Sequence, residues 1–359
     1  MTKSVYIHIP FCKNICSYCD FCKFIYNEKW VGAYLTGLNN EIKDRYMDDP
    51  IKTIYIGGGT PSVLSIDELK RLFKIISVFN TNDLEEFTFE CNLSDINEGL
   101  LEILKNNKVN RLSIGIQSFN EKNLEFMERN ADFKDALKKV DLCHQYGFNN
   151  INLDLMYAIP GETLKDLKKD LDLFLKLNPT HISTYSLILE DHTKLSSKNV
   201  SYIEEELDYE MFKLISKKLN SANHYEISNF SIPGYESKHN LVYWNNEEYY
   251  GFGLGASGYI DDIRYQNTKN LKEYLLGNYV LEKEILGLKE KMDYEIMLGL
   301  RKLKGINILE FKNKYSKDIE EVYNLKPLLK SKDLIKKKGY IFINPQKIYI
   351  MNEILIKII

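Results

Sequence analysis

Three cysteines near the amino terminus carry the clearest chemical signal in this sequence. Cys12, Cys16 and Cys19 follow the spacing Cys-x3-Cys-x2-Cys. Three thiolates on one tight loop can bind three irons of a 4Fe–4S cluster and leave the fourth iron open, whereas electron-transfer clusters are closed by four cysteines. An open metal position is what a catalytic site needs. The spacing predicts such a cluster, with the amino and carboxylate groups of S-adenosylmethionine on the open iron and an electron donor as a partner.

Cys22 supplies a fourth thiol and keeps a structural zinc site open as an alternative. It stands three residues after Cys19, and all four sulfurs fall within residues 12–22. Zinc loops usually pair two Cys-x2-Cys units across a longer stretch. The spacing favours the cluster, although it does not exclude zinc by itself.

The composition is that of a globular protein with room for about two domains. The 359 residues are 44% hydrophobic and carry a formal net charge of -3, which gives no overall attraction to nucleic acid. The amino terminus lacks the apolar region of a secretion signal, and no apolar run is long enough for a membrane span. Clustered thiols without such a signal predict a cytoplasmic location. A lysine-rich run between Lys326 and Lys338 is typical of a solvated face, with a membrane or partner contact as the alternative.

Short apolar runs alternate with amphipathic stretches through the first half of the chain. The runs that predict strands are Val5–Ile9, Thr53–Ile56, Glu86–Glu90, Arg111–Ile116, Asn150–Leu155 and His181–Leu187. The stretches that predict helices are Trp30–Arg45, Ser65–Phe79, Asn97–Asn106, Glu121–Phe126, Phe133–Tyr146 and Thr163–Leu177. Six strand–helix units in series imply an α/β fold with a parallel sheet and right-handed crossovers. Periodicity fits a curved partial barrel and a flat sheet equally well.

Beyond about residue 200 the alternation stops. Helices are expected over Tyr202–Ala222 and residues 292–305, and a small helix–turn–helix with a hairpin at Tyr340–Ile350 follows. We therefore expect three parts, which are the core (1–200), a segment flanking the site (201–270) and a small C-terminal domain (271–359). No tight basic recognition helix is visible, so DNA binding is not favoured.

The polar candidates outside the cysteine loop fall at or near the carboxyl ends of predicted strands, where parallel α/β folds place their chemistry. Glycines there let the backbone approach a ligand closely. The other side chains offer carboxylates, an amide and a guanidinium to the polar groups of a ligand. Tyr18 could stack on an adenine ring or simply pack. Taken singly, each is also compatible with a turn or a surface position: Gly58, Thr60, Glu90, Gln117, Arg129 and Asp154.

Four longer motifs resemble the radical S-adenosylmethionine enzymes related to oxygen-independent coproporphyrinogen dehydrogenase. They are Tyr6–Cys12, Gly57–Pro61, Gly115–Phe119 and Asp154–Thr163. The resemblance implies a partial (β/α)6 barrel followed by a smaller α+β domain with a winged-helix-like end. It assigns the cluster to the three cysteines, and it assigns S-adenosylmethionine to Tyr6, Tyr18, Gly58, Thr60, Glu90, Gln117, Arg129 and Asp154.

One more motif resembles the haem chaperone branch of this family. His239, Tyr243 and Trp244 fit the pattern His-Asn-x-x-Tyr-Trp. Histidine is a common axial haem ligand, and the two aromatic residues can wall a macrocycle. The alternative is a histidine that is hydrogen-bonded in an aromatic core. On the resemblance, these three residues are expected to bind haem as cargo for haem-accepting proteins, membrane-bound ones included.

The competing function is that of the dehydrogenase itself, which decarboxylates the propionate side chains of coproporphyrinogen III by radical chemistry. Five residues precede Tyr6 here, where the dehydrogenase carries a longer segment. Its fourth cysteine also follows the third after two residues, and Cys22 follows after three. Ser257 and Asn130 stand where chaperone relatives often have histidine. Peripheral membrane association and a homodimer are compatible with the resemblance.

Overall fold

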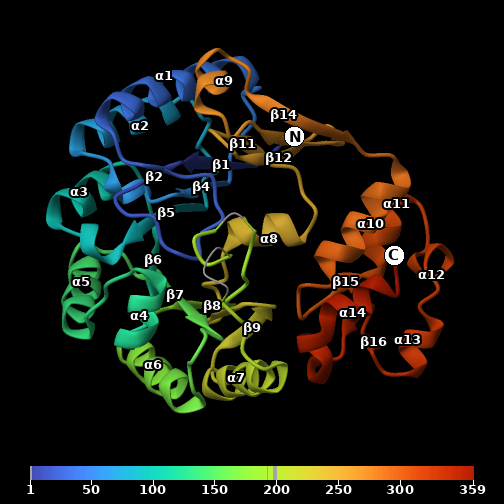
Figure 1. The fold of residues 1–359 in the computed structure, drawn as a ribbon. Helices are drawn as coiled ribbons and strands as arrows, with labels where there is room; N and C mark the ends of the chain where they lie inside the picture. The colour runs from blue at the N-terminus through green and yellow to red at the C-terminus, as the bar shows by residue number, and fades with distance from the viewer. Residues whose placement is uncertain (1, 192, 197–199) are drawn as a thin grey trace.

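A curved sheet forms the centre of the structure, a computed structural model that describes every residue except 1, 192 and 197–199. Within those residues the sheet has nine strands, in the order β11-β1-β4-β5-β6-β7-β8-β10-β9. Its parallel centre coincides with the six expected strands, which are β1 (Ser4–Ile9), β4 (Thr53–Gly58), β5 (Glu86–Asn92), β6 (Arg111–Gln117), β7 (Asn150–Tyr157) and β8 (His181–Ser186). The expected partial (β/α)6 barrel is confirmed (Figure 1).

Helices cover the outer side of this sheet (Figure 1). Capping side chains fix where they begin: Ser65 and Glu68 form a capping box at α2, and Thr163 and Asp166 form one at α6. Apolar faces pack inward, as Leu171 of α6 does with no exposed surface. The helices are α1 (Glu28–Arg45), α2 (Ile66–Ile76), α3 (Glu98–Asn106), α4 (Glu121–Met127), α5 (Phe133–Gln145) and α6 (Leu164–Lys176).

Three strands of the sheet were not expected from the sequence. β11 (Tyr250–Phe252) pairs parallel to β1, while β10 (Asn229–Ser231) and β9 (Asn223–Glu226) extend the opposite edge antiparallel to β8. Each has only three or four residues, too few to show a period. Gly251 in β11 faces the next strand so closely that a Cβ would lie 1.8 Å from the Ser257 carbonyl oxygen.

A helix precedes these three strands in the chain, and a second sheet follows them. α7 (Glu205–Lys218) precedes β9 and is shorter than the expected helix Tyr202–Ala222. A three-stranded antiparallel sheet follows β11, made of β12 (Ser257–Ile260), β13 (Ile263–Asn267) and β14 (Val280–Ile285), with α9 (Leu271–Leu275) between the last two. In the part of the chain that is described, no helix is long and apolar enough to cross a membrane.

Residues 288–359 form a C-terminal unit with its own hydrophobic core. Its order of elements, strand–helices–hairpin, is that of a winged helix, as expected. The elements are α10 (Leu288–Gly299), β15 (Ile306–Asn307), α11 (Ile308–Tyr315), α12 (Ile319–Val322), α13 (Lys326–Lys330), β16 (Leu334–Lys337), β17 (Tyr340–Ile343) and α14 (Met351–Ile356). In the lysine run, Lys336 pairs with Glu320 and Lys337 is exposed, which fits a solvated face.

Two boundaries in this unit differ from the expectation. The hairpin spans Leu334–Ile343 instead of Tyr340–Ile350, because Lys338 and Gly339 supply the two positive φ angles (52° and 80°) of a tight hairpin turn. The helix expected over residues 292–305 begins at Leu288 and ends at Gly299. A turn follows there, and the Leu303 amide donates to the carbonyl oxygen of Tyr225 in β9 (3.1 Å).

Candidate functional site

The carboxyl ends of the parallel strands surround a cavity of about 460 Å³. All three cysteines of the Cys-x3-Cys-x2-Cys loop line it. The structure also brings together seven side chains or backbone positions that the sequence placed at one site. They are Tyr18, Gly58, Thr60, Glu90, Gln117, Arg129 and Asp154.

The cysteine loop leaves β2 (Phe11–Cys12) and returns at β3 (Phe24–Ile25), and these two strands pair with each other. Ser17 anchors the loop, because its hydroxyl donates to the Phe126 carbonyl (2.8 Å) and its amide to that of Met127 (3.2 Å). The paired strands β2 and β3 and the buried Ser17 therefore hold the loop in place, and its three thiols line the cavity.

Hydrogen-bond donors surround the cysteine sulfurs. Arg129 Nη1 lies 3.3 Å from the Cys16 Sγ, and the Thr60 hydroxyl donates to the Cys12 Sγ (3.7 Å). Burial raises the pKa of Cys12 to about 11 and also raises that of Cys19. Metal binding therefore has to release protons from these thiols, which makes it pH-dependent. The Thr60 hydroxyl opposes the effect of burial on Cys12 and favours the thiolate form that a metal requires.

Cys22 stands apart from this arrangement. It does not line the cavity in the described structure, and its Sγ packs toward Gly255 of the loop after β11. Its carbonyl oxygen is hydrogen-bonded to the His8 ring (2.8 Å). Among the described residues, no three His, Cys, Asp or Glu side chains converge closely enough to hold a single metal ion. The choice between a cluster and a zinc ion therefore rests on the family to which the chain belongs.

Glu90 and the glycine segment after β4 form one wall of the cavity. Glu90 accepts hydrogen bonds from the Tyr55 hydroxyl (2.7 Å) and the Gly58 amide (3.0 Å). Burial raises its pKa to about 7, so a cationic ligand would favour its ionised form. Gly58 has φ +112° and a Cβ there would lie 2.5 Å from the His8 ring, so only glycine fits.

Gln117 and Arg129 form a second wall. Gln117 adopts φ +74° at an irregularity in the β6–β7 pairing, an uncommon backbone conformation for a residue with a side chain. Arg129 Nη2 donates to Asn92 Oδ1 and to the Gly115 carbonyl, both at 2.7 Å. These bonds fix the guanidinium between the strand ends and the cysteine loop.

Asp154 completes the polar lining from β7. Its Oδ1 accepts a hydrogen bond from Asn152 (2.8 Å), and burial raises its pKa. The sequence reasoning missed Asn92 and Tyr185, which also line the cavity. Asn92 lies two residues after Glu90 in β5, and Tyr185 lies two residues after Ser183 in β8. Because strand side chains alternate between faces, this spacing could have predicted both.

Tyr6 is placed differently from the other predicted contacts of S-adenosylmethionine. It is absent from the cavity lining in the described structure, and its hydroxyl is bonded to His8 Nδ1 at 2.9 Å. Burial lowers the pKa of His8 to about 4, so this ring is neutral. Tyr6 and His8 thus support the cavity floor beneath Gly58.

The three residues predicted to bind haem lie on α8 (Lys238–Trp244), at the opposite ends of the strands. His239 has no exposed surface. One ring nitrogen is bonded to the hydroxyl of Thr53, the first residue of β4, and the other to that of Tyr243, both at 2.8 Å. Neither nitrogen is open to a haem iron in this arrangement, which is the aromatic-core environment of the alternative interpretation.

The backbone at the start of α8 is tied to the sheet as well. Glu86, the first residue of β5, accepts from the amides of Lys238 (2.9 Å) and His239 (3.0 Å). Trp244 lies at the far end of the helix, with the Arg301 guanidinium 5.8 Å from its ring centre. The helix therefore closes the amino-terminal ends of β4 and β5 and faces the C-terminal unit on its other side (Figure 1).

Comparisons with known proteins identify the family. Residues 6–174 match the radical SAM superfamily and residues 286–348 match the HemN C-terminal domain. The chain is 41% identical to the heme chaperone HemW of Lactococcus lactis subsp. lactis (strain IL1403), over 89% of this chain and 87% of that protein. The chain belongs to the HemW family of radical SAM proteins. The HemW of Bacillus subtilis (strain 168) is 38% identical, with 98% of this chain and 96% of the relative covered.

A solved structure supports the fold assignment. Coproporphyrinogen III oxidase (HemN) from Escherichia coli superposes with a TM-score of 0.87 over 99% of this chain and 89% of that chain, at 20% identity. At this level of identity, the likeness shows that the two proteins share a fold and says nothing about the activity of this chain.

Membership of the radical SAM superfamily implies a 4Fe–4S cluster and S-adenosylmethionine. The donor set of the cavity fits both groups. Two of the three thiols contact a guanidinium or a hydroxyl donor, which suits thiolate ligands of a cluster. The half-buried carboxyls of Glu90 and Asp154 suit the amino group and ribose hydroxyls of a nucleoside with an amino-acid tail.

Proposed function

We propose that this protein is a haem chaperone that binds a 4Fe–4S cluster, S-adenosylmethionine and haem, and that delivers the haem to other proteins. The observation that carries the proposal is the 41% identity to the Lactococcus heme chaperone HemW over 89% of the chain. The cavity residues support binding of the two cofactors, and the sequence similarity to proteins named heme chaperone supports haem as the cargo.

The chain's own residues have separate tasks in this proposal. Cys12, Cys16 and Cys19 hold the cluster, which when bound supplies one electron for cleavage of a carbon–sulfur bond. Arg129 holds the loop against the strand ends through its hydrogen bond to the Cys16 sulfur.

The S-adenosylmethionine assignment rests on the cavity wall. Glu90 and Gly58 are hydrogen-bonded to each other and so present the carboxyl and the turn backbone in a fixed geometry. Asp154, Tyr18 and Gln117 line the same cavity. Together these residues supply two carboxyls, an amide and an aromatic ring, which suits a zwitterionic amino acid joined to a nucleoside.

The remaining parts of the proposal concern the whole chain. Haem-accepting proteins, including membrane-bound ones, are the proposed recipients, and a one-electron donor is the partner of the cluster. The division at residues 200 and 270 and a peripheral contact with the membrane also remain predictions. So does the assembly as a monomer or homodimer.

An anaerobic haem titration of cluster-reconstituted protein, followed by absorbance, tests the proposed cargo. Saturable binding near one haem per chain is expected, together with transfer of that haem to the apo form of a haem protein. Binding that never saturates, or haem that does not leave for an acceptor, would count against a chaperone.

The competing dehydrogenase function is decided by a separate assay. The cluster is reduced anaerobically in the presence of S-adenosylmethionine and coproporphyrinogen III, and the products are separated by chromatography. We expect no protoporphyrinogen. Protoporphyrinogen and 5′-deoxyadenosine formed in stoichiometric amounts would overturn the proposal in favour of the enzyme.

A further inference from the structure

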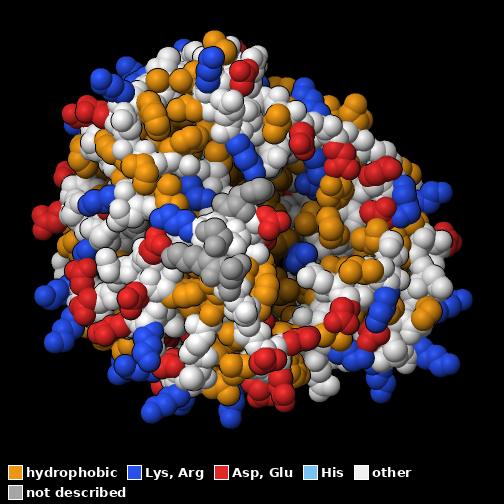
Figure 2. Space-filling model, viewed as in Figure 1, with side chains coloured by type: hydrophobic (Ala, Val, Ile, Leu, Met, Phe, Trp, Pro, Cys, Tyr) orange, Lys and Arg blue, Asp and Glu red, His pale blue; other side chains and the backbone are white. Residues whose placement is uncertain are grey.

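A second cavity, of about 850 Å³, lies between α8 and the C-terminal unit. The surface is hollowed there, to the right of the centre of Figure 2. The cavity is at the amino-terminal ends of the barrel strands, because α8 and β9 bond to the first residues of β4, β5 and β8. It is therefore a site separate from the cysteine-lined cavity, and nothing above assigns it a ligand.

The walls of this cleft come from two parts of the chain that are tied together. Leu241 of α8 and Asn245, which caps the end of that helix, line one side. The turn Lys302–Ile306, with Phe311 of α11 and Tyr340 of β17, lines the other. The Leu303 amide donates to the Tyr225 carbonyl (3.1 Å), and Lys302 forms a β-bridge with Glu226. The backbone bonds hold the two sides at a fixed separation, so the cleft is preformed.

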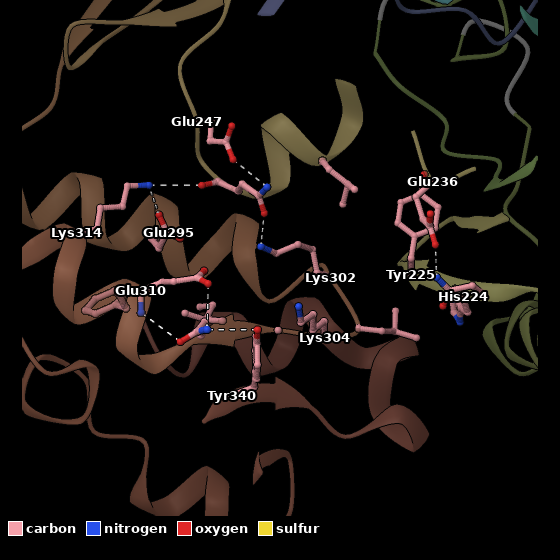
Figure 3. Close-up of a pocket in the computed structure, with 18 residues that line it drawn as sticks. His224, Tyr225, Glu236, Glu247, Glu295, Lys302, Lys304, Glu310, Lys314 and Tyr340 are labelled. Atoms are coloured by element: carbon pink, nitrogen blue, oxygen red, sulfur yellow. Dashed lines mark hydrogen bonds and ion pairs between the residues drawn. The ribbon is translucent and has the colours of Figure 1, made fainter. Parts of the chain in front are cut away.

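Size and chemistry of the walls suit a large planar ligand with an anionic edge. Ligand cavities span about 300–1,000 Å³ and are mostly apolar with a few polar groups that fix orientation. Leu241, Ile306 and Phe311 supply the apolar surface. Lys302 and Lys304 project from the turn on the C-terminal side (Figure 3).

The two lysines are the cations of the cleft that have no carboxylate partner among the described residues. Lys302 Nζ donates to Asn245 Oδ1 (2.5 Å), and Lys304 Nζ lies 4.9 Å from the centre of the Tyr340 ring. Burial lowers the pKa of Lys302, so its ammonium is poorly solvated and gains from an incoming anion. The third lysine, Lys314, is paired with Glu295 (2.7 Å).

The acidic side chains that face the cleft are already engaged. Glu236 accepts from Asn223 (2.6 Å), and Glu247 from Asn245 (3.0 Å). Glu310 accepts from Asn307 (3.1 Å), and Glu295 accepts from Tyr315 (2.9 Å) in addition to its lysine. Among the described residues the lining thus holds four glutamates and three lysines, and Lys302 and Lys304 are the two of these lysines that form no ion pair with a carboxylate.

We propose that this cleft is the haem site, with the two propionate carboxylates paired to Lys302 and Lys304 and the macrocycle lying against the wall formed by α8. The inference rests on the proposed haem-chaperone function and deepens it. It also gives the His-Asn-x-x-Tyr-Trp helix a role: α8 buries His239 in the barrel, and Leu241 of the helix and its cap residue Asn245 face the cargo.

We assign the iron to Tyr340, because the Nε2 atom of His224, which also lines the cleft, is bonded to the Ile227 carbonyl oxygen (3.3 Å). A tyrosine oxygen is an established axial ligand of haem iron. Its hydroxyl accepts a hydrogen bond from Asn307 Nδ2 (3.3 Å), and the Lys304 ammonium lies beside the ring. These two neighbours, Lys304 first, lower the pKa of Tyr340 and so favour the phenolate that ligates ferric iron.

The test is a haem titration of four forms of the full-length, cluster-loaded protein. These are the wild type, the double variant Lys302→Gln/Lys304→Gln, the single variant Lys304→Gln and the matched control Lys337→Gln. Lys337 is exposed on β16 outside the cleft and loses the same charge. Loss of two charge-assisted pairs should weaken haem binding about 10- to 100-fold in the double variant. The control should bind like the wild type.

Two further probes separate the carboxylates from the iron. Metal-free protoporphyrin IX should depend on the lysines as haem does, whereas the dimethyl ester of haem should bind the double variant and the wild type alike. Tyr340→Phe should weaken haem binding and shift its absorbance, yet leave protoporphyrin IX binding unchanged. Unchanged haem binding and spectrum in Tyr340→Phe would remove the iron-ligand assignment.

The outcomes distinguish the site from the function. If the wild type binds haem and the lysine variants bind it equally well, the cleft proposal is wrong while the chaperone function stands. If the wild type binds no haem, both fail. Intact cluster absorbance and an unchanged unfolding midpoint report that each variant is folded, and the exposed Lys304→Gln carries the test if the double variant is unstable.

Discussion

At the scale of single residues, the four cysteines of the amino-terminal loop have different surroundings. Cys12, Cys16 and Cys19 open into the strand-end cavity, and two of them contact a hydroxyl or guanidinium donor. Cys22 packs toward Gly255 and lies outside the lining of that cavity in the described structure. A thiol turned away from the cavity is poorly placed to share a metal site with the other three.

This difference predicts opposite results for two matched substitutions. Cys19→Ser should lose the cluster because it removes one of three iron ligands. Cys22→Ser should retain iron and sulfide near the wild-type content. The check is iron and acid-labile sulfide analysis with the absorbance spectrum after anaerobic reconstitution. Equal loss in both variants would mean that four thiols share one metal site.

Buried Glu226 makes stability depend on pH. Glu226 in β9 is 1% exposed, and burial raises its pKa to about 7 from an ordinary value near 4.5. The folded state therefore holds a proton that the unfolded state has lost between these pH values, and stability falls as pH rises through that window. Above about pH 7 the buried charge lowers the free energy of unfolding by its full amount, about 3 kcal/mol.

Glu226→Gln should remove this cost. Urea unfolding of cluster-free protein at pH 5 and pH 8 should show the variant gaining stability over the wild type at pH 8, and much less at pH 5. Glu282→Gln, which changes an exposed carboxyl on β14, serves as the control and should follow the wild type. A Glu226→Gln variant with the wild-type pH slope would show that Glu226 is ionised in the fold.

At the residue scale, the sequence predicted which side chains share a cavity where chemistry and strand position agreed, and their binding roles stay predictions. Ten of the eleven residues assigned to the cluster and S-adenosylmethionine line one cavity, because parallel strands bring their carboxyl ends together. Tyr6 is the exception. It lies near the middle of β1, and its side chain points into the barrel beneath Gly58. How deep a side chain lies inside a barrel depends on the tertiary structure, and the spacing of residues in the sequence does not reveal it.

At the scale of elements, α8 covers the amino-terminal ends of β4 and β5, and its His239 ring is hydrogen-bonded to the hydroxyls of Thr53 and Tyr243. His239→Ala should remove the ring's bonds to the Thr53 and Tyr243 hydroxyls, of which Thr53 keeps its bond to Ser4, and open a cavity beneath Tyr55, whose ring centre is 5.4 Å away. The expected loss of unfolding free energy is about 3 kcal/mol. Urea unfolding measures it, and Tyr243→Phe, which removes one bond, should cost about 1 kcal/mol.

The same pair of variants separates structure from ligation. If His239→Ala keeps wild-type stability and yet abolishes haem binding, His239 is a haem ligand and the structural interpretation is wrong. If haem binding follows stability across the two variants, the histidine serves the fold.

Element prediction succeeded where the periodic signal was long. The six parallel strands and their helices have runs of several residues that show a clear period, and each was found within a few residues. β9, β10 and β11 are too short for that and owe their pairing to tertiary contacts, such as the close approach of Gly251 to Ser257. Position 257 is exposed on β12, so the departure from histidine there does not touch the core.

At the scale of the whole molecule, the two cavities lie at opposite ends of the barrel strands. Side-chain contacts connect them. Glu90 lines the cysteine-lined cavity and accepts a hydrogen bond from Tyr55, and the Tyr55 ring packs near His239 on the inner side of α8. Lysine, arginine and acidic side chains are interspersed over the face seen in Figure 2, in keeping with a net charge of -3. The arrangement predicts that haem and the cofactors occupy the protein together.

The measurement that tests the central claim most directly is the anaerobic haem titration of cluster-loaded protein with S-adenosylmethionine present. A haem chaperone with separate sites should bind about one haem per chain in a saturable manner, with the cluster absorbance unchanged. No saturable binding would contradict the chaperone function. Haem binding that displaces the cluster or S-adenosylmethionine would contradict the separation of the two sites.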